Sequence, residues 1–152
     1  MKYLAYPRSV LLLAGALLLG GCAAINDTTM RALATSAPAL AVVSERVLSG
    51  EVLLYSDRSG KLQLRSEGEP ALNCMGALRY TATSSGTVNL SCSDGRQAQL
   101  PFTALGETSG YSGTVGGPIS FTYGLAPESA RAWLTPPPGK RLVVSGDSLR
   151  LE

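Results

Sequence analysis

The sequence predicts a mostly β protein: a small antiparallel meander or partly closed barrel of about seven to nine strands, with one short C-terminal helix. Three observations carry this prediction. Turn-forming residues separate short apolar segments, one later segment has helical spacing, and apolar residues alternate in four successive segments. The alternating pairs are Val52/Leu54, Leu62/Leu64, Leu78/Tyr80 and Val88/Leu90.

The N-terminal segment has the layout of a secretory signal. Lys2 and Arg8 precede an apolar run over residues 10–19, and the small residues Gly20 and Gly21 follow it. The run is half the length of the roughly 20 residues that a transmembrane helix needs. A cleaved signal is therefore favoured over a permanent membrane span.

The residues Leu19-Gly20-Gly21-Cys22 resemble the lipobox of bacterial lipoproteins, over residues 1–24 only. The resemblance implies removal of residues 1–21 and acylation of Cys22 by palmitate-like chains on its sulfur and new amino group. Ala23 directly after the cysteine implies the outer membrane, with the domain facing the periplasm. The alternative is an ordinary secreted protein in which Cys22 is a bare thiol.

Removal of residues 1–21 from the 152-residue chain leaves 131 residues, enough for a single domain. Of the 13 basic residues, Lys2 and Arg8 leave with the signal, so 11 basic residues balance 11 acidic ones. A neutral chain lacks the positive footprint of a nucleic-acid-binding protein, and that function is excluded.

The three cysteines support a lipidated and oxidised protein. Lipidation of Cys22 leaves Cys74 and Cys92, which should form a disulfide in an oxidising compartment. The chain has no histidine and no Cys-x-x-Cys, which disfavours a zinc site or a redox pair. If Cys74 faces Cys92 directly on neighbouring strands, Tyr80 must face Gly86.

Residues 22–45 are interpreted as a lipidated tether, and residues 46–152 as a single β domain. The tether is rich in alanine, serine and threonine, and Thr29–Ala37 has the spacing of a short helix. A helix packed on the domain is the alternative. Within the domain, hairpins over residues 50–64 and 76–90 superpose with a shift of 26 positions, which places their even-numbered residues on one inner face.

Later elements follow from the same signals. Residues 96–103 form a further strand, in which Pro101 predicts an edge or a bulge. Residues 111–115 and 119–123 form a hairpin. Residues 126–134 form the helix, since Pro127 suits its first turn and three prolines end it. Residues 142–144 and 149–151 form the last hairpin.

The sequence favours a protein that is not an enzyme and that needs no cofactor or metal. Without histidine, the usual triads and catalytic metal sites are missing. Paired carboxylates remain conceivable at Glu67 with Glu69, or at Asp57 with Asp94, but these residues fall in turns where acidic side chains are ordinary.

The candidate interface lies on the outward face of the first two hairpins. Its basic and apolar side chains suit a partner protein or an acidic polysaccharide. Trp133, the single tryptophan, is added as a possible stacking platform, although a lid on the core is the favoured interpretation of it. The candidate residues are Leu53, Tyr55, Lys61, Arg65, Arg79 and Trp133. The alternatives are a solvated face, or burial of Leu53 and Tyr55 under the helix.

The predicted function is that of an outer-membrane lipoprotein with a non-catalytic periplasmic domain. The membrane is reached through the N-terminal acyl chains. The domain is expected to bind another envelope component, a protein or a glycan, in an accessory or structural role. The alternative is an inhibitor of a lysozyme-type enzyme, by analogy with small disulfide-bonded β domains.

Overall fold

The computed structural model describes residue 29, residues 32–113 and residues 117–152. The chain divides into two compact units, Met1–Ala34 and Thr35–Glu152. The predicted signal and Cys22 lie outside the described residues. In the described part of the first unit, the backbone N–H of Leu33 donates to the carbonyl of Thr29 over 3.2 Å, as in one helical turn. No helix among the described residues is long and apolar enough to cross a bilayer.

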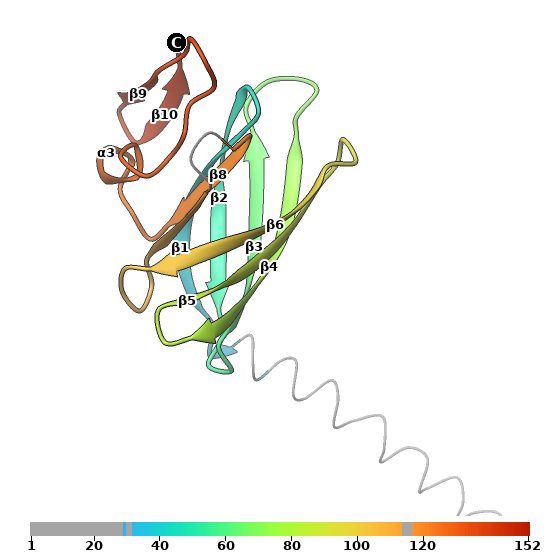
Figure 1. Cartoon of the computed structure of the whole chain (residues 1–152), viewed down its shortest axis with the longest axis vertical. Helices are drawn as coiled ribbons and strands as arrows, with labels where there is room; N and C mark the ends of the chain where they lie inside the picture. Colours follow the sequence, from blue (N-terminus) through green and yellow to red (C-terminus); the bar gives the residue numbers. More distant parts are fainter. Residues whose placement is uncertain (1–28, 30–31, 114–116) are drawn as a thin grey trace, which may run out of the picture. The chain divides into compact units, whose positions relative to one another are not determined.

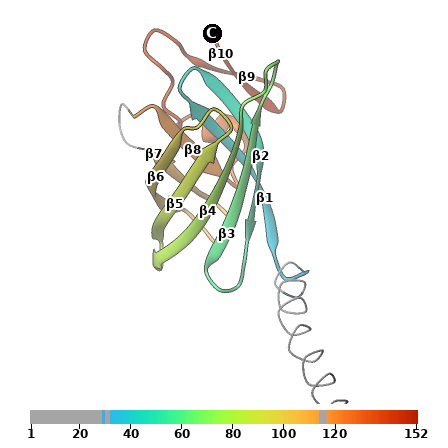
Figure 2. The ribbon, with the colours of Figure 1, turned by 90° about the vertical axis from the view of Figure 1, so that its right-hand side faces the viewer.

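The second unit is built on a closed antiparallel barrel of eight strands (Figures 1 and 2). Successive strands pair as neighbours, and β1 closes the barrel against β8 from Ala39↔Tyr123 to Val43↔Ile119. The predicted β class is confirmed. The strands are β1 (Thr35–Val43), β2 (Arg46–Leu54), β3 (Ser59–Ser66), β4 (Asn73–Ala82), β5 (Ser85–Cys92), β6 (Gln97–Ala104), β7 (Gly110–Gly113) and β8 (Ile119–Tyr123).

The predicted start of the β domain at Arg46 is wrong, because Thr35–Val43 is the first strand of the barrel. Residues 35–45 therefore do not belong to a tether, and the predicted helix cannot extend to Ala37. The reason is that β1 is buried on both faces over most of its length. Such a strand shows a continuous apolar run instead of alternation. The alanines of β1 are small, so the sequence offered little sign that this segment is buried in a core.

The barrel interior is filled by side chains. The even-numbered inward face predicted for β2–β5 is confirmed, since residues such as Leu62, Leu78 and Val88 are almost completely buried. Aromatic rings occupy the space over two inward glycines. A Cβ added to Gly86 would lie 2.5 Å from the Phe102 ring, and one added to Gly110 would lie 2.6 Å from the Tyr123 ring. The interior is thus a packed core.

A second, smaller core lies on the outside of β1. The helix α3 (Pro127–Ala130) and the hairpin of β9 (Leu142–Ser145) and β10 (Ser148–Leu151) contribute apolar side chains that pack on Leu40 and Val42. The short C-terminal helix is confirmed, with proline in its first turn. It ends at Ala130, earlier than predicted, and it packs against β1 and not over Leu53 and Tyr55.

Pro101 lies within β6, which pairs with strands on both sides. It stands opposite Thr87 of β5, and the described ladder to β7 begins at the next residue, Phe102. The carbonyl of Pro101 accepts a hydrogen bond from the Ser112 hydroxyl at 2.5 Å. Proline has no backbone N–H to donate. Because the described ladder to β7 does not include Pro101, this inner strand accommodates a proline there.

Candidate functional site

The outer surfaces of β2–β6 form the part of the described barrel that carries the predicted interface. We call the outward side chains of these five strands the exposed face. The register aligns them in rows that run across the strands. One row is Leu53, Lys61, Ala77, Asn89 and Gln99, and the next is Glu51, Gln63, Met75, Ser91 and Gln97.

Five of the six predicted interface residues lie together on or beside this face. Leu53 stands opposite Lys61 across β2 and β3, and Arg79 on β4 is the diagonal neighbour of Lys61. Arg65 lies further along β3. Tyr55 follows the end of β2, where its N–H donates to the carbonyl of Ser59 at 2.9 Å. The three cations are exposed, whereas Leu53 and Tyr55 are half-buried.

Trp133, the sixth residue, lies elsewhere. Its indole ring stacks on Tyr111 of β7, with ring centroids 4.2 Å apart and an angle of 22° between the planes. The side chain is 41% exposed and does not belong to either core cluster. The favoured interpretation of Trp133 as a lid on the core is therefore wrong. The structure does not unite it with the other candidate residues.

Lys61 and Arg79 differ from most cations of the described chain. Neither makes an ion pair or a side-chain hydrogen bond within the parts that the structure describes. Arg65, in contrast, approaches Glu69 at 3.9 Å. The one acid of the two rows, Glu51, accepts a hydrogen bond from the Ser36 hydroxyl at 2.9 Å. The centre of the exposed face therefore carries two cations that no acidic side chain contacts within the described structure.

The sequence reasoning missed the half of this face that β5 and β6 contribute. This half carries three exposed amide side chains, Asn89, Gln97 and Gln99. Met75 on the neighbouring strand β4 is 62% exposed. The signal was present, because these residues occupy odd-numbered positions of strands whose even-numbered positions face inward. If the rule that odd-numbered residues face outward had been applied to β6 as well as to the first two hairpins, it would have identified these amides.

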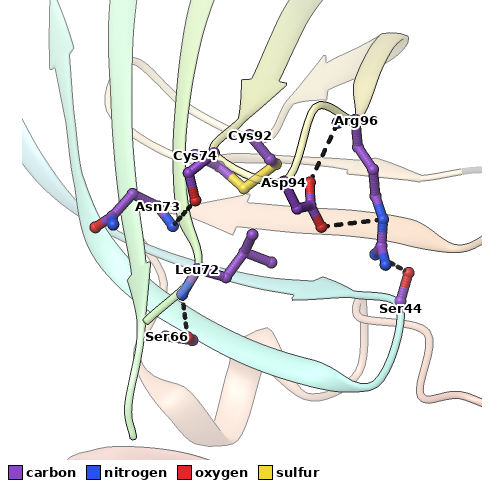
Figure 3. Close-up of a disulfide and its surroundings, with 9 residues drawn as sticks. Ser44, Ser66, Leu72, Asn73, Cys74, Cys92, Asp94 and Arg96 are labelled. Carbon is purple, nitrogen blue, oxygen red and sulfur yellow. Dashed lines mark hydrogen bonds and ion pairs between the residues drawn. A yellow bond between two sulfur atoms is a disulfide. The ribbon is translucent and has the colours of Figure 1, made fainter. Parts of the chain in front are cut away.

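The barrel end formed by the β1–β2, β3–β4 and β5–β6 connections contains a cleft of about 650 Å³. Two arginines bridge its rim. Arg96 of the β5–β6 turn contacts the Ser44 hydroxyl and forms an ion pair with Asp94 at 3.1 Å (Figure 3). Arg46 donates to the carbonyl of Pro70 at 2.7 Å. Because these polar groups bond to one another, the cleft offers fewer free groups than the exposed face.

The disulfide between Cys74 and Cys92 lies beneath this end, and both residues are buried (Figure 3). Cys74 pairs directly with Cys92, and Tyr80 pairs with Gly86. Both the bridge and the predicted register are confirmed. The bridge fixes β4 against β5, two of the strands that display the exposed face.

The carboxylates considered for catalysis are separated or engaged. Asp57 lies in the β2–β3 turn and Asp94 in the β5–β6 turn, at opposite ends of the barrel. Asp57 accepts a hydrogen bond from the Ser59 hydroxyl at 2.5 Å. Glu67 and Glu69 are exposed in the β3–β4 loop. Among the residues with described positions, no group of three or more potential metal ligands gathers.

Comparisons with protein-family models, with curated proteins and with solved structures gave no match to this chain. The geometry of the exposed face is therefore the basis for a functional proposal. The alternative function as a lysozyme-type inhibitor stays a prediction.

Proposed function

We propose that the chain is an outer-membrane lipoprotein, anchored through an acylated Cys22, whose barrel is a non-catalytic binding module for another component of the cell envelope. The observation that carries the binding role is the pair Lys61 and Arg79, exposed on strands and left without an acidic partner in the described structure. The signal-like N-terminus and the lipobox-like Leu19–Cys22 segment support the anchor.

The packed interior supports a scaffold role for the barrel. Phe102, Phe121 and Tyr123 fill the space between the strands, so the outer surfaces are the accessible binding surfaces of the barrel wall. The backbone of paired strands is held in a fixed position, so a partner that binds there need not order the chain that carries the contact residues. The role that follows is accessory or structural, with the exposed face as the contact surface.

A photo-crosslinking amino acid placed at Met75 tests this proposal in living cells. Met75 is a large side chain, 62% exposed, on β4, the middle strand of the exposed face. Ser145, exposed on β9, is the matched control position on another surface. We expect a discrete adduct with an envelope protein, or attachment to cell-wall material, from position 75 and not from position 145. Equal adducts from both positions, or none from position 75, would contradict the proposal.

A further inference from the structure

We infer that the exposed face binds an acidic polysaccharide, with a sugar carboxylate seated over Ala77 between Lys61 and Arg79. This inference rests on the proposed function and names the chemistry of the partner. It depends on three features: the arrangement of the two cations, their lack of acidic partners, and the amides that surround them.

The register places the two cations around a small residue. Lys61 on β3 stands directly opposite Ala77 on β4, and Arg79 is the next outward residue of β4. Diagonal neighbours of this kind have Cα atoms about 7–8 Å apart, within reach of long side chains. The side chain of Ala77 is a single methyl group, so an anionic group above it can contact the ammonium and the guanidinium together.

The charges favour an anion from outside the chain. Lys61 and Arg79 make no ion pair in the described structure. The carboxylates of Glu51 and Asp57 keep their charge, but they contact the hydroxyls of Ser36 and Ser59 and not the two cations. A carboxylate that contacts both cations forms charge-assisted hydrogen bonds, which are stronger than neutral ones. Because the site is open to solvent, such binding is sensitive to salt.

The flanking side chains favour a polysaccharide over an acidic protein. Asn89 stands opposite Ala77 on β5, and Gln99 and Gln63 lie in the same and the adjoining row. Primary amides both donate and accept hydrogen bonds, as sugar hydroxyls do. Protein interfaces, in contrast, have an apolar core. Met75 is the one large hydrophobic side chain on the described exposed face that is mostly exposed.

Affinity electrophoresis tests the inference, with the purified full chain in non-ionic detergent. The native gel contains polygalacturonate, a linear polymer of uronic acids, or neutral dextran. We expect polygalacturonate to retard the chain and dextran not to. The double variant Lys61→Gln/Arg79→Gln should lose about tenfold in apparent affinity, as two charge-assisted contacts disappear.

The matched control is Lys140→Gln/Arg150→Gln, which removes the same two charges from exposed positions near and on the C-terminal hairpin. It should bind as the unchanged chain does. Equal binding by both double variants would overturn the inference, and so would equal retardation by poly-L-glutamate, which carries carboxylates without sugar hydroxyls. Unchanged thermal unfolding shows that the variants remain folded.

The crosslinking experiment separates this inference from the proposed function. An envelope protein crosslinked from position 75, together with no retardation by polygalacturonate, would overturn the inference and leave the binding role intact. Retardation without any adduct from position 75 would support the polysaccharide site and contradict the role assigned to the face in cells.

Discussion

The hydroxyl oxygens of Tyr80 and Tyr123 lie 2.9 Å apart in the barrel, and their hydrogen bond joins β4 to β8, which are not neighbours in the sheet. Tyr123 is fully buried, whereas Tyr80 is partly exposed. The two ends of this bond are therefore not equivalent. Water can replace the lost partner of Tyr80 more readily than that of Tyr123.

Tyr80→Phe should destabilise the barrel more than Tyr123→Phe. The first change leaves the buried hydroxyl of Tyr123 without a partner, at a cost of about 1–3 kcal/mol. The second removes that buried hydroxyl and leaves Tyr80 beside solvent. Urea unfolding of both variants measures the difference in free energy, and the reverse ranking would show that the bond does not organise the core as described.

Stability should fall at alkaline pH because of the same residue. Burial, and next the hydrogen bond to Tyr80, raise the pKa of the Tyr123 phenol far above its usual value of 10.0. Above about pH 10, the unfolded chain releases this proton and the folded chain retains it, so the free energy of unfolding falls by about 1.4 kcal/mol per pH unit. Below that pH the contribution is fully present.

Unfolding measured at about pH 9 and about pH 11 in the unchanged chain and in Tyr123→Phe checks this linkage. The variant should show a smaller decrease, since it lacks the titrating phenol. The same decrease in both proteins would mean that other groups cause the alkaline loss.

Thr122→Val should leave the stability unchanged or raise it by about 1 kcal/mol. The Thr122 hydroxyl is buried on β8 and has no hydrogen-bond partner among the described residues. Valine keeps the shape of the side chain and removes the cost of burying a polar group.

Ser120→Ala is the control, because the Ser120 hydroxyl accepts a hydrogen bond from the backbone N–H of Thr135 at 2.9 Å. The control should lose about 0.5–1.5 kcal/mol. Thermal unfolding that ranks the two variants in the opposite order would contradict this account of β8.

Removal of the disulfide by Cys74→Ala and Cys92→Ala should lower the free energy of unfolding by about 3 kcal/mol, since the bridge closes a loop with a sequence separation of 18. In the unchanged chain, mass analysis after alkylation should find these two thiols only when a reductant has been added. Alkylation of both without reductant would remove the bridge from the native protein.

Much of this barrel can be predicted from the sequence where strands have one buried face. The alternation in β2–β5 predicts the inner residues, and the two domain cysteines then fix the register that pairs Tyr80 with Gly86. Local pattern is sufficient there because one side of each strand contacts solvent. The same alternation placed Lys61 and Arg79 on the outer surface.

The missed features depend on contacts between distant segments. β1 lacks alternation because the C-terminal helix and hairpin cover its outer face through Leu40 and Val42. The stack of Trp133 on Tyr111 joins residues of separate elements, and no spacing in the sequence signals it. The closure of β1 on β8 likewise becomes visible only in three dimensions.

The most direct test of the whole account is mass analysis of the native chain extracted from cell membranes. The account predicts a chain that begins at Cys22, carries acyl groups on this residue and stays in the membrane fraction at high salt. Cys22→Ser should abolish both the cleavage and the acylation. A native chain without acyl groups that washes freely out of broken cells would contradict the anchor, and with it the envelope partner proposed for the exposed face.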